Sequence, residues 1–124
     1  MEKVILVVDD SPTTRKIVSM IVEEMGHRVV TASDGFEAIS LLENTCVDMI
    51  ITNLNMPHYN GYQLIDAIRK EYKDKQIPIL IMSSEDHFDQ IQKGYRLGAD
   101  AYLIKPFIPE VLQNEIRKWL QKSE

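Results

Sequence analysis

The chain has 124 residues, the size of one ordinary domain with a single hydrophobic core. Its composition, 44% hydrophobic and 27% charged, is typical of a soluble globular protein, and its formal net charge of -5 argues against a nucleic-acid-binding surface. No apolar run approaches the ~20 residues that a membrane-spanning helix needs.

Five apolar, strand-like runs alternate with five amphipathic helical stretches. The first run, residues 3–8, is rich in Val, Ile and Leu, as expected of a buried parallel strand. Ser11 then supplies a helix N-cap, Pro12 suits the first helical position, and Gly26 ends the helix. The other expected strands are 28–32, 47–52, 77–83 and 101–104, and the other expected helices are 34–43, 62–72, 86–97 and 109–121.

This alternation predicts an α/β fold with the topology (βα)5. Short connections between strand and helix favour a doubly wound, five-stranded parallel sheet covered on both faces. Residues 1–124 are expected to form one domain, because no linker, repeat or low-complexity segment interrupts them. In such sheets, ligands bind beyond the carboxyl ends of the strands, near the point where the strand order reverses.

Polar residues stand where four of the strands end. Asp9 and Asp10 follow the first strand, Asn53 follows the third, Ser83 ends the fourth and Lys105 follows the fifth. The adjacent acids alone are typical of solvated loop residues, but Mg²⁺ also prefers such oxygen ligands. Because all four strand ends meet at one edge of the sheet, together they predict a pocket for magnesium and a phosphoryl group.

The neighbouring residues have both a functional and an ordinary structural interpretation. Asn55 precedes Met56-Pro57, where extended geometry could turn its backbone carbonyl toward a metal or simply form a loop. The Ser83 hydroxyl could bond a phosphoryl oxygen, and the Lys105 ammonium could pair with an acid or a phosphoryl oxygen. Tyr102 is expected to be a core or half-exposed aromatic residue.

Other features exclude several kinds of site. The single cysteine, Cys46, excludes an internal disulfide, fits a reducing cytoplasm and is expected to be a small buried hydrophobe. His27, His58 and His87 show no metal-ligand spacing and are expected at the surface. The N-terminal segment lacks the pattern of a secretory signal. The acidic first loop lacks the Gly-rich pattern that cradles phosphates, which argues against a nucleotide- or flavin-binding version of the fold.

Taken in order, these motifs resemble the receiver domains of two-component response regulators of the CheY-like type. Each motif is weakly specific alone, but their combination is highly specific and covers essentially the whole chain. The motifs are Val7-Val8-Asp9-Asp10-Ser11, Asn53-Leu54-Asn55-Met56-Pro57 with Gly61, Met82-Ser83-Ser84, and Tyr102-Leu103-Ile104-Lys105-Pro106-Phe107.

The resemblance implies a flavodoxin-like fold and a Mg²⁺ site. Asp9, Asp10 and the backbone carbonyl of Asn55 would hold the cation, with the amide oxygen of Asn53 as a weak further ligand. Position 53 is where the family carries its phosphoacceptor aspartate. Asn55 and Glu85 match the positions that tune self-dephosphorylation.

The resemblance also implies a switch. Ser83 would move toward the phosphoryl group, Tyr102 would turn inward with it, and Lys105 would pair with the phosphoryl oxygens. Without that group, Ser83 and Tyr102 are expected to take the inactive positions. The resemblance makes the bond before Pro106 cis, whereas the base rate of ~5–6% cis predicts trans.

The implied partners are proteins. A sensor histidine kinase or a phosphotransfer protein would act on the chain, in chemotaxis or another two-component pathway. An output protein would bind the face of the fourth helix, fifth strand and fifth helix, around Lys93, Arg96, Tyr102 and Ile104. A cytoplasmic location is expected, without nucleic-acid binding or membrane insertion.

The departure from the family is Asn53. A carboxamide is no nucleophile, so the chain is expected to form no acyl phosphate and not to be an enzyme. A parent with aspartate there would only catalyse its own phosphorylation and dephosphorylation. An engineered, non-phosphorylatable form is favoured because Asp9, Asp10, Ser83 and Lys105 are all retained. The alternative is a natural pseudo-receiver that binds proteins without phosphorylation, and a phosphatase or flavin protein is the least favoured reading.

Overall fold

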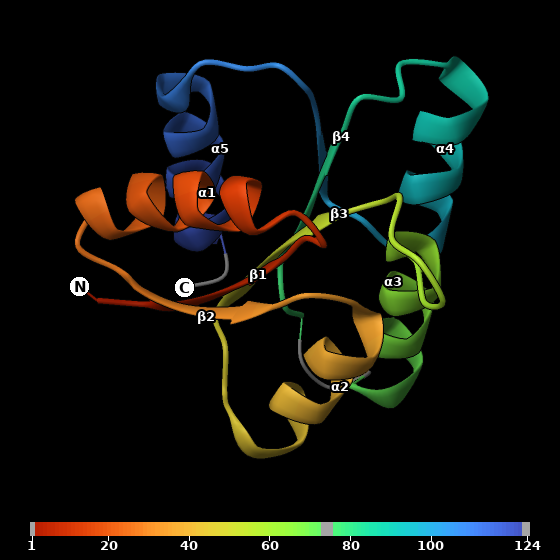
Figure 1. Cartoon of the computed structure of the whole chain (residues 1–124), viewed down its shortest axis with the longest axis horizontal. Helices are drawn as coiled ribbons and strands as arrows, with labels where there is room; N and C mark the ends of the chain where they lie inside the picture. The colour runs from red at the N-terminus through yellow and green to blue at the C-terminus, as the bar shows by residue number, and fades with distance from the viewer. Residues whose placement is uncertain (1, 73–75, 123–124) are drawn as a thin grey trace.

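Residues 2–72 and 76–122 are described by a computed structural model of the chain. Within them, five strands alternate with five helices (Figure 1). In chain order these are β1 (Val4–Val8), α1 (Pro12–Glu24), β2 (Arg28–Ala32), α2 (Gly35–Asn44), β3 (Met49–Asn53), α3 (Gly61–Glu71), β4 (Ile79–Ser83), α4 (Phe88–Leu97), β5 (Ala101–Ile104) and α5 (Pro109–Lys122).

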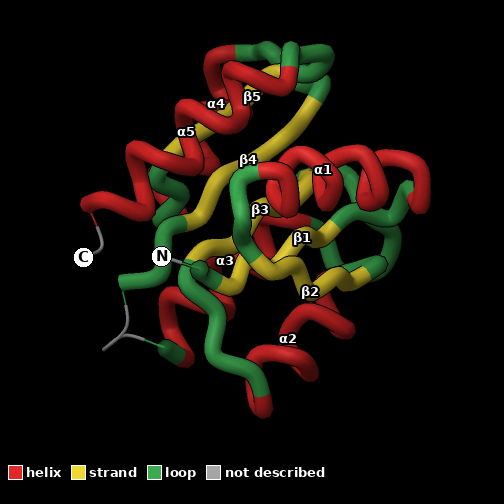
Figure 2. Tube along the Cα trace, turned by 90° about the vertical axis from the view of Figure 1, so that its left-hand side faces the viewer, coloured by secondary structure: helices red, strands yellow, loops and turns green. Residues whose placement is uncertain are grey.

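The strands form one parallel sheet in the order β2-β1-β3-β4-β5. From β1 the chain first runs outward to β2 and then returns across β1 to β3, so the strand order reverses between β1 and β3. α1 and α5 cover one face, and α2, α3 and α4 cover the other (Figure 1). Figure 2 shows the strands enclosed between the two layers of helices. The predicted doubly wound, five-stranded parallel sheet is therefore confirmed.

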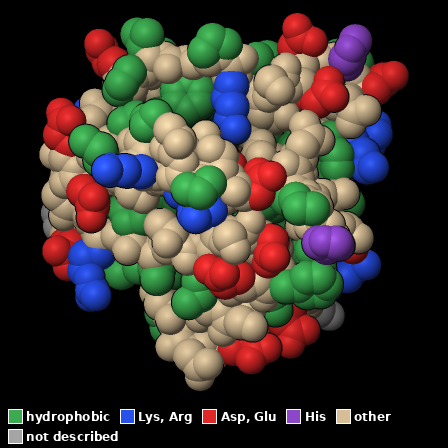
Figure 3. Space-filling model, viewed as in Figure 1, with side chains coloured by type: hydrophobic (Ala, Val, Ile, Leu, Met, Phe, Trp, Pro, Cys, Tyr) green, Lys and Arg blue, Asp and Glu red, His purple; other side chains and the backbone are tan. Residues whose placement is uncertain are grey.

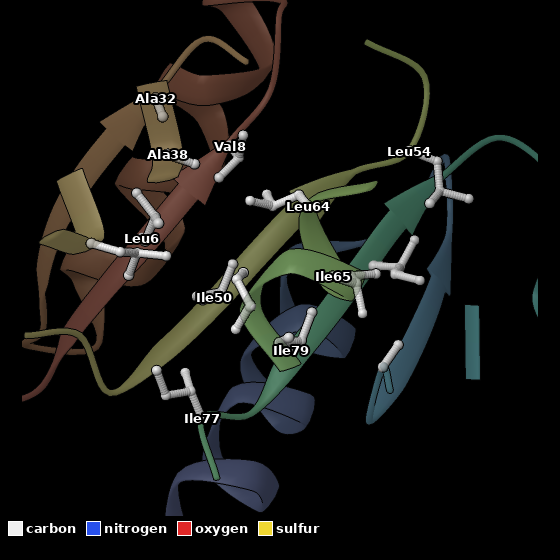
Figure 4. Packing of buried hydrophobic residues seen from close by; sticks show 14 of the residues in the cluster. Leu6, Val8, Ala32, Ala38, Ile50, Leu54, Leu64, Ile65, Ile77 and Ile79 are labelled. Atoms are coloured by element: carbon white, nitrogen blue, oxygen red, sulfur yellow. The ribbon is translucent and has the colours of Figure 1, made fainter. Parts of the chain in front are cut away.

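Two hydrophobic clusters hold the helices on the sheet. Leu6 and Ile50 point toward α2 and α3, as Figure 4 shows, whereas Ile5 and Ile51 point toward α1 and α5. All five residues of β3 and of β4 are buried, which explains why these strands are almost continuously apolar in sequence. Each fully buried aliphatic side chain contributes about 1.5–3 kcal/mol. This packing fixes the position of the strand ends, where the polar residues stand.

Backbone hydrogen bonding explains where the elements begin. α3 starts with a capping box, in which the Asn60 side chain accepts from Gln63 and the Gln63 side chain accepts from the Asn60 N–H. β3 begins two residues later than predicted, and just ahead of it the Asp48 N–H donates to the Val4 carbonyl at 2.7 Å while the Asp48 carboxylate accepts from the Val4 N–H at 2.8 Å. β4 begins after Pro78, which has no N–H to donate to a neighbouring strand.

Several apolar side chains are exposed. Cys46 is exposed, so the prediction that it is buried is wrong: β3 begins at Met49, which leaves Cys46 in the loop and not beside the strand entrance. Ile17 and Phe36 fall at helical spacing but are 53% and 58% exposed. Figure 3 shows exposed hydrophobic side chains interspersed with charged ones on the face seen in Figure 1. Among the described residues, no helix has the length and apolar composition that would let it cross a bilayer.

His27 does not lie fully at the surface, although His58 and His87 do. It is half-buried just before β2, and its Nδ1 accepts a hydrogen bond from the Lys3 backbone N–H at 3.1 Å. Burial lowers the pKa of His27 below its ordinary value of 6.5. The neutral form is therefore the one that the folded chain prefers.

This preference predicts a pH dependence of stability. As the pH falls below 6.5, the unfolded chain takes up a proton at His27 before the folded chain does, so the free energy of unfolding decreases. His27→Gln, which retains an acceptor oxygen, should remove that part of the decrease. Urea unfolding at a series of pH values measures this decrease in the free energy of unfolding. Identical pH profiles for the unaltered chain and His27→Gln would contradict the prediction that His27 causes it.

Candidate functional site

The polar residues at the strand ends come together as the sequence predicts. β1, β3, β4 and β5 are consecutive neighbours in the sheet, and their register aligns Val8 with Thr52, Asn53 with Met82, and Ser83 with Ile104. Their carboxyl ends therefore form one edge beside the point where the strand order reverses. Polar contacts join the side chains of four residues there: Asp9, Asp10, Asn53 and Lys105.

Asn53 lies at the centre of this group and is only 8% exposed. Its Nδ2 donates to the Asn55 backbone carbonyl at 3.1 Å and to Asp10 Oδ1 at 3.4 Å. Its Oδ1 accepts from Lys105 Nζ at 3.4 Å. An ammonium group can only donate, so the amide oxygen must face Lys105 and the amide nitrogen must face the acidic side.

Asp9 is the buried acid of the site, with 1% of its side chain exposed. Its Oδ1 accepts from the Ser11 N–H at 2.9 Å, and its Oδ2 pairs with Lys105 Nζ at 3.3 Å. These partners compensate a carboxylate that would otherwise be costly to bury. The peptide bond between Lys105 and Pro106 is cis, which confirms what the resemblance implies and contradicts the base rate.

Arg15 is a site residue that the sequence analysis missed. Its Nη1 donates to the backbone carbonyl of Asp9 at 2.6 Å from the second turn of α1. The guanidinium therefore places a second positive charge close to Asp9. The signal in the sequence was a basic residue a short distance after the acidic pair, at the start of a helix.

The loop after β3 fixes the backbone of the site. The Gly61 N–H donates to the Leu54 carbonyl at 2.9 Å, which closes the loop. A Cβ at Gly61 would stand directly against the carbonyl oxygen of Asn53 and 2.9 Å from Leu54 Cα. Glycine is therefore required here by close backbone approach. Asn55 is exposed, and its carbonyl faces inward to the Asn53 amide.

Ser83 and Tyr102 meet through the backbone of Glu85. Ser83 is fully buried, and its Oγ accepts from the Glu85 N–H at 3.0 Å. The Tyr102 hydroxyl donates to the Glu85 carbonyl at 2.9 Å, and its ring packs against the core. Burial raises the pKa of the Tyr102 phenol, and a hydrogen bond with Ser83 opposes this. Tyr102 is therefore partly buried, as expected of a core or half-exposed aromatic residue.

The fit of Mg²⁺ can be judged from the donor set. Asp10 Oδ1 and the Asn55 carbonyl are the oxygens that would face a cation, and both already accept from the Asn53 NH₂ group. Asp9 is engaged by Lys105. With Asn53 in this orientation, the residues present do not fit Mg²⁺.

Comparison with known proteins agrees with this architecture. A family model described as the response regulator receiver domain matches residues 5–117. The probable transcriptional regulator ycf27 of Guillardia theta is 39% identical over 120 residues, which are 96% of this chain and 46% of that protein. The chain thus spans about half the length of that relative. The chemotaxis protein CheY of Pseudomonas aeruginosa is 33% identical over 119 residues, which are 95% of this chain and 96% of that protein.

Solved structures give the same result. The chemotaxis response regulator CheY4 of Vibrio cholerae superposes with a TM-score of 0.89 at 34% identity, covering 96% of this chain and 99% of that one. Receiver domains are typically non-catalytic signalling modules that generally bind Mg²⁺ and interact with histidine kinases or phosphotransfer proteins and with output partners. These matches agree with the topology of the sheet and with the polar residues that meet at its edge. The chain therefore belongs to the CheY-like response regulator receiver domains of two-component systems.

Proposed function

We propose that this chain is a two-component receiver that keeps its phosphoryl pocket but has a silenced acceptor, an engineered non-phosphorylatable form in which Asn53 stands in place of the phosphoacceptor aspartate. The observation that carries the proposal is the amide of Asn53 at the centre of the pocket. Its nitrogen is a hydrogen-bond donor to Asn55 and Asp10, and its oxygen is held by Lys105. Neither atom is a nucleophile for a phosphoryl group, so the chain forms no acyl phosphate and is not an enzyme.

The residues around Asn53 support a receiver with a silenced acceptor. Lys105 stands 3.4 Å from the Asn53 amide oxygen, where it would pair with a phosphoryl group on an aspartate. In an Asn53→Asp form, Asp9, Asp10 and the Asn55 carbonyl would supply oxygen ligands for Mg²⁺. Ser83 would engage the phosphoryl group, and the side chains at positions 55 and 85 would tune its hydrolysis.

The proposed protein-binding surface is the output face of α4, β5 and α5. Lys93, Arg96 and Ile104 are exposed there, and Ile104 is 42% exposed. The kinase or phosphotransfer contact, a chemotaxis pathway and a cytoplasmic location belong to the same proposal, in which residues 1–124 act as one receiver domain.

Phosphoryl labelling tests this function. The chain and its Asn53→Asp variant are treated with acetyl phosphate and Mg²⁺, and intact mass is measured. The expected result is a single phosphoryl adduct on Asn53→Asp and none on the chain itself. Asn55→Asp is the matched control, because it adds a carboxylate two residues away, outside the centre of the pocket, and should stay unlabelled. An adduct on the unchanged chain would refute the proposal.

A natural pseudo-receiver is the second candidate, and the position of Tyr102 favours it. Its ring packs inward against the core and its hydroxyl is bound to Glu85, the arrangement that the resemblance associates with the active output face. Such a chain would bind its output partner constitutively. In that case Asn53→Asp stays unlabelled, because the pocket no longer supports phosphoryl transfer.

A further inference from the structure

We infer that the side-chain amide of Asn53 takes the structural place of the divalent cation in this receiver, and that Lys105 holds the amide in the orientation that excludes Mg²⁺. The inference deepens the proposed function and rests on it, because it treats the pocket as a receiver pocket with a silenced acceptor. It predicts a site that is assembled without metal.

The first step is the direction of the NH₂ group. Asn53 Nδ2 lies 3.1 Å from the Asn55 carbonyl and 3.4 Å from Asp10 Oδ1, so a single donor group joins two acceptors from different loops. A cation bound at this edge would hold the loop after β1 against the loop after β3 in the same way. The positive end of the amide dipole does this with hydrogen bonds in a position that is 8% exposed.

The second step is the way in which Lys105 fixes the orientation of the Asn53 amide. Coordination of Mg²⁺ by Asn53 requires its Oδ1 to turn toward Asp10, which would turn its NH₂ group toward Lys105. Both groups would then be donors, and an ammonium has no lone pair with which to accept. Lys105 also pairs with the buried Asp9 carboxylate at 3.3 Å, so its withdrawal would leave that charge without its cation.

The third step is the rigidity of the backbone beneath the amide. The Asn53 carbonyl accepts from Thr52 Oγ1 at 2.9 Å and lies against Gly61, with no room even for a Cβ. Both neighbours of Asn53 in the chain, Thr52 and Leu54, are buried. The side chain therefore cannot leave by a shift of the strand end, and rotation of the amide is the movement that remains.

A Mg²⁺ titration followed by NMR tests the inference. The reporters are the backbone amides of Asp10 and Asn55 and the side-chain NH₂ of Asn53. Trp119 is unsuitable as a fluorescent reporter because it lines a hollow with Pro78 and Asp100, at the opposite edge of the sheet. We expect Asn53→Asp to bind Mg²⁺ more than about tenfold more tightly than the unchanged chain. Equal affinities would overturn the inference.

A double-mutant cycle separates two effects on Mg²⁺ binding: the orientation that Lys105 imposes on the Asn53 amide, and the absence of a negative charge at position 53. Lys105→Gln removes the ammonium and supplies an oxygen that can accept from a rotated NH₂ group. Removing a positive charge strengthens Mg²⁺ binding in either background. Only where Asn53 is present does the removal of Lys105 also free the side-chain amide to rotate. We therefore expect Lys105→Gln to raise the Mg²⁺ affinity by a larger factor beside Asn53 than in the Asn53→Asp background. Equal factors would show that charge alone accounts for the difference.

A measurement on the unchanged chain completes the test without relying on any variant. The NH₂ protons of Asn53 are expected to exchange slowly with solvent and to keep their chemical shifts as Mg²⁺ is added at millimolar concentration. Fast exchange, or a shift that saturates with Mg²⁺, would overturn the inference. Neither outcome alters the phosphoryl labelling result, so a failure here is distinguishable from a failure of the proposed function.

Discussion

Replacing Asn53 by aspartate is expected to lower the free energy of unfolding in metal-free buffer by about 2 kcal/mol. The carboxylate would repel Asp9 and Asp10, and its attraction to Lys105 offsets about one of these two repulsions. A charge pair at ~4 Å is worth between ~1 kcal/mol in water and ~4 kcal/mol at an effective dielectric constant of ~20. The hydrogen bond to the Asn55 carbonyl would also be lost.

Urea unfolding of both proteins, with and without Mg²⁺, measures this effect. Mg²⁺ should restore much of the stability of Asn53→Asp, since a ligand that binds only the folded state stabilises it, and should change the unaltered chain little. Asn53→Ala is the matched control, because it removes the amide hydrogen bonds and adds no charge. If Asn53→Asp is as stable as the unaltered chain without metal, the repulsion argument fails.

Gly61→Ala is expected to destabilise the fold by about 2–3 kcal/mol. The added Cβ would press on the carbonyl oxygen of Asn53 and stand 2.9 Å from Leu54 Cα, and backbone atoms of a buried strand end cannot move aside cheaply. The substitution should also disturb the hydrogen bonds of the Asn53 side chain, which the NH₂ resonance of that residue would report.

Gly94→Ala provides the comparison for Gly61→Ala. Its Cβ would lie 2.7 Å from Ile81 Cδ1, the flexible end of a side chain, which can rotate. In the interior of α4, alanine also stabilises the helix by about 1 kcal/mol relative to glycine. We expect this variant to unfold at nearly the same urea concentration as the unaltered chain. If the two alanine variants lose equal stability, close backbone approach is not the reason that position 61 is glycine.

The sequence was sufficient for the fold and for placing several polar residues at one edge of the sheet. Buried parallel strands have a continuous apolar signature, as in residues 79–82, and the residue that follows such a strand must stand at the carboxyl edge of the sheet. Asp9, Asn53 and Lys105 could therefore be placed together, although they are far apart in the chain.

The arrangement inside the site could not be predicted in the same way. The direction of the Asn53 amide depends on which donors and acceptors surround it within 3.4 Å, and that is a property of the folded chain. Arg15 was missed because its partner is a backbone carbonyl, a group that every residue has, so a basic residue near the start of a helix did not by itself identify the contact. The inward position of Tyr102 likewise depends on the carbonyl of Glu85. Cys46 was misplaced because β3 begins at Met49 and not at Val47, so Cys46 lies in a loop ahead of the strand and not at its entrance.

The two backbone hydrogen bonds of Glu85 affect which amino acids position 85 can accept. Besides the hydrogen bond between Ser83 and Tyr102, the backbone N–H and carbonyl of Glu85 join the buried Ser83 hydroxyl to the Tyr102 phenol, and these two bonds do not use the Glu85 side chain. Almost any amino acid at position 85 would preserve these two hydrogen bonds. Proline is the exception, because it lacks the N–H. Selection can therefore change the side chain at position 85 while the link between Ser83 and Tyr102 is inherited unchanged.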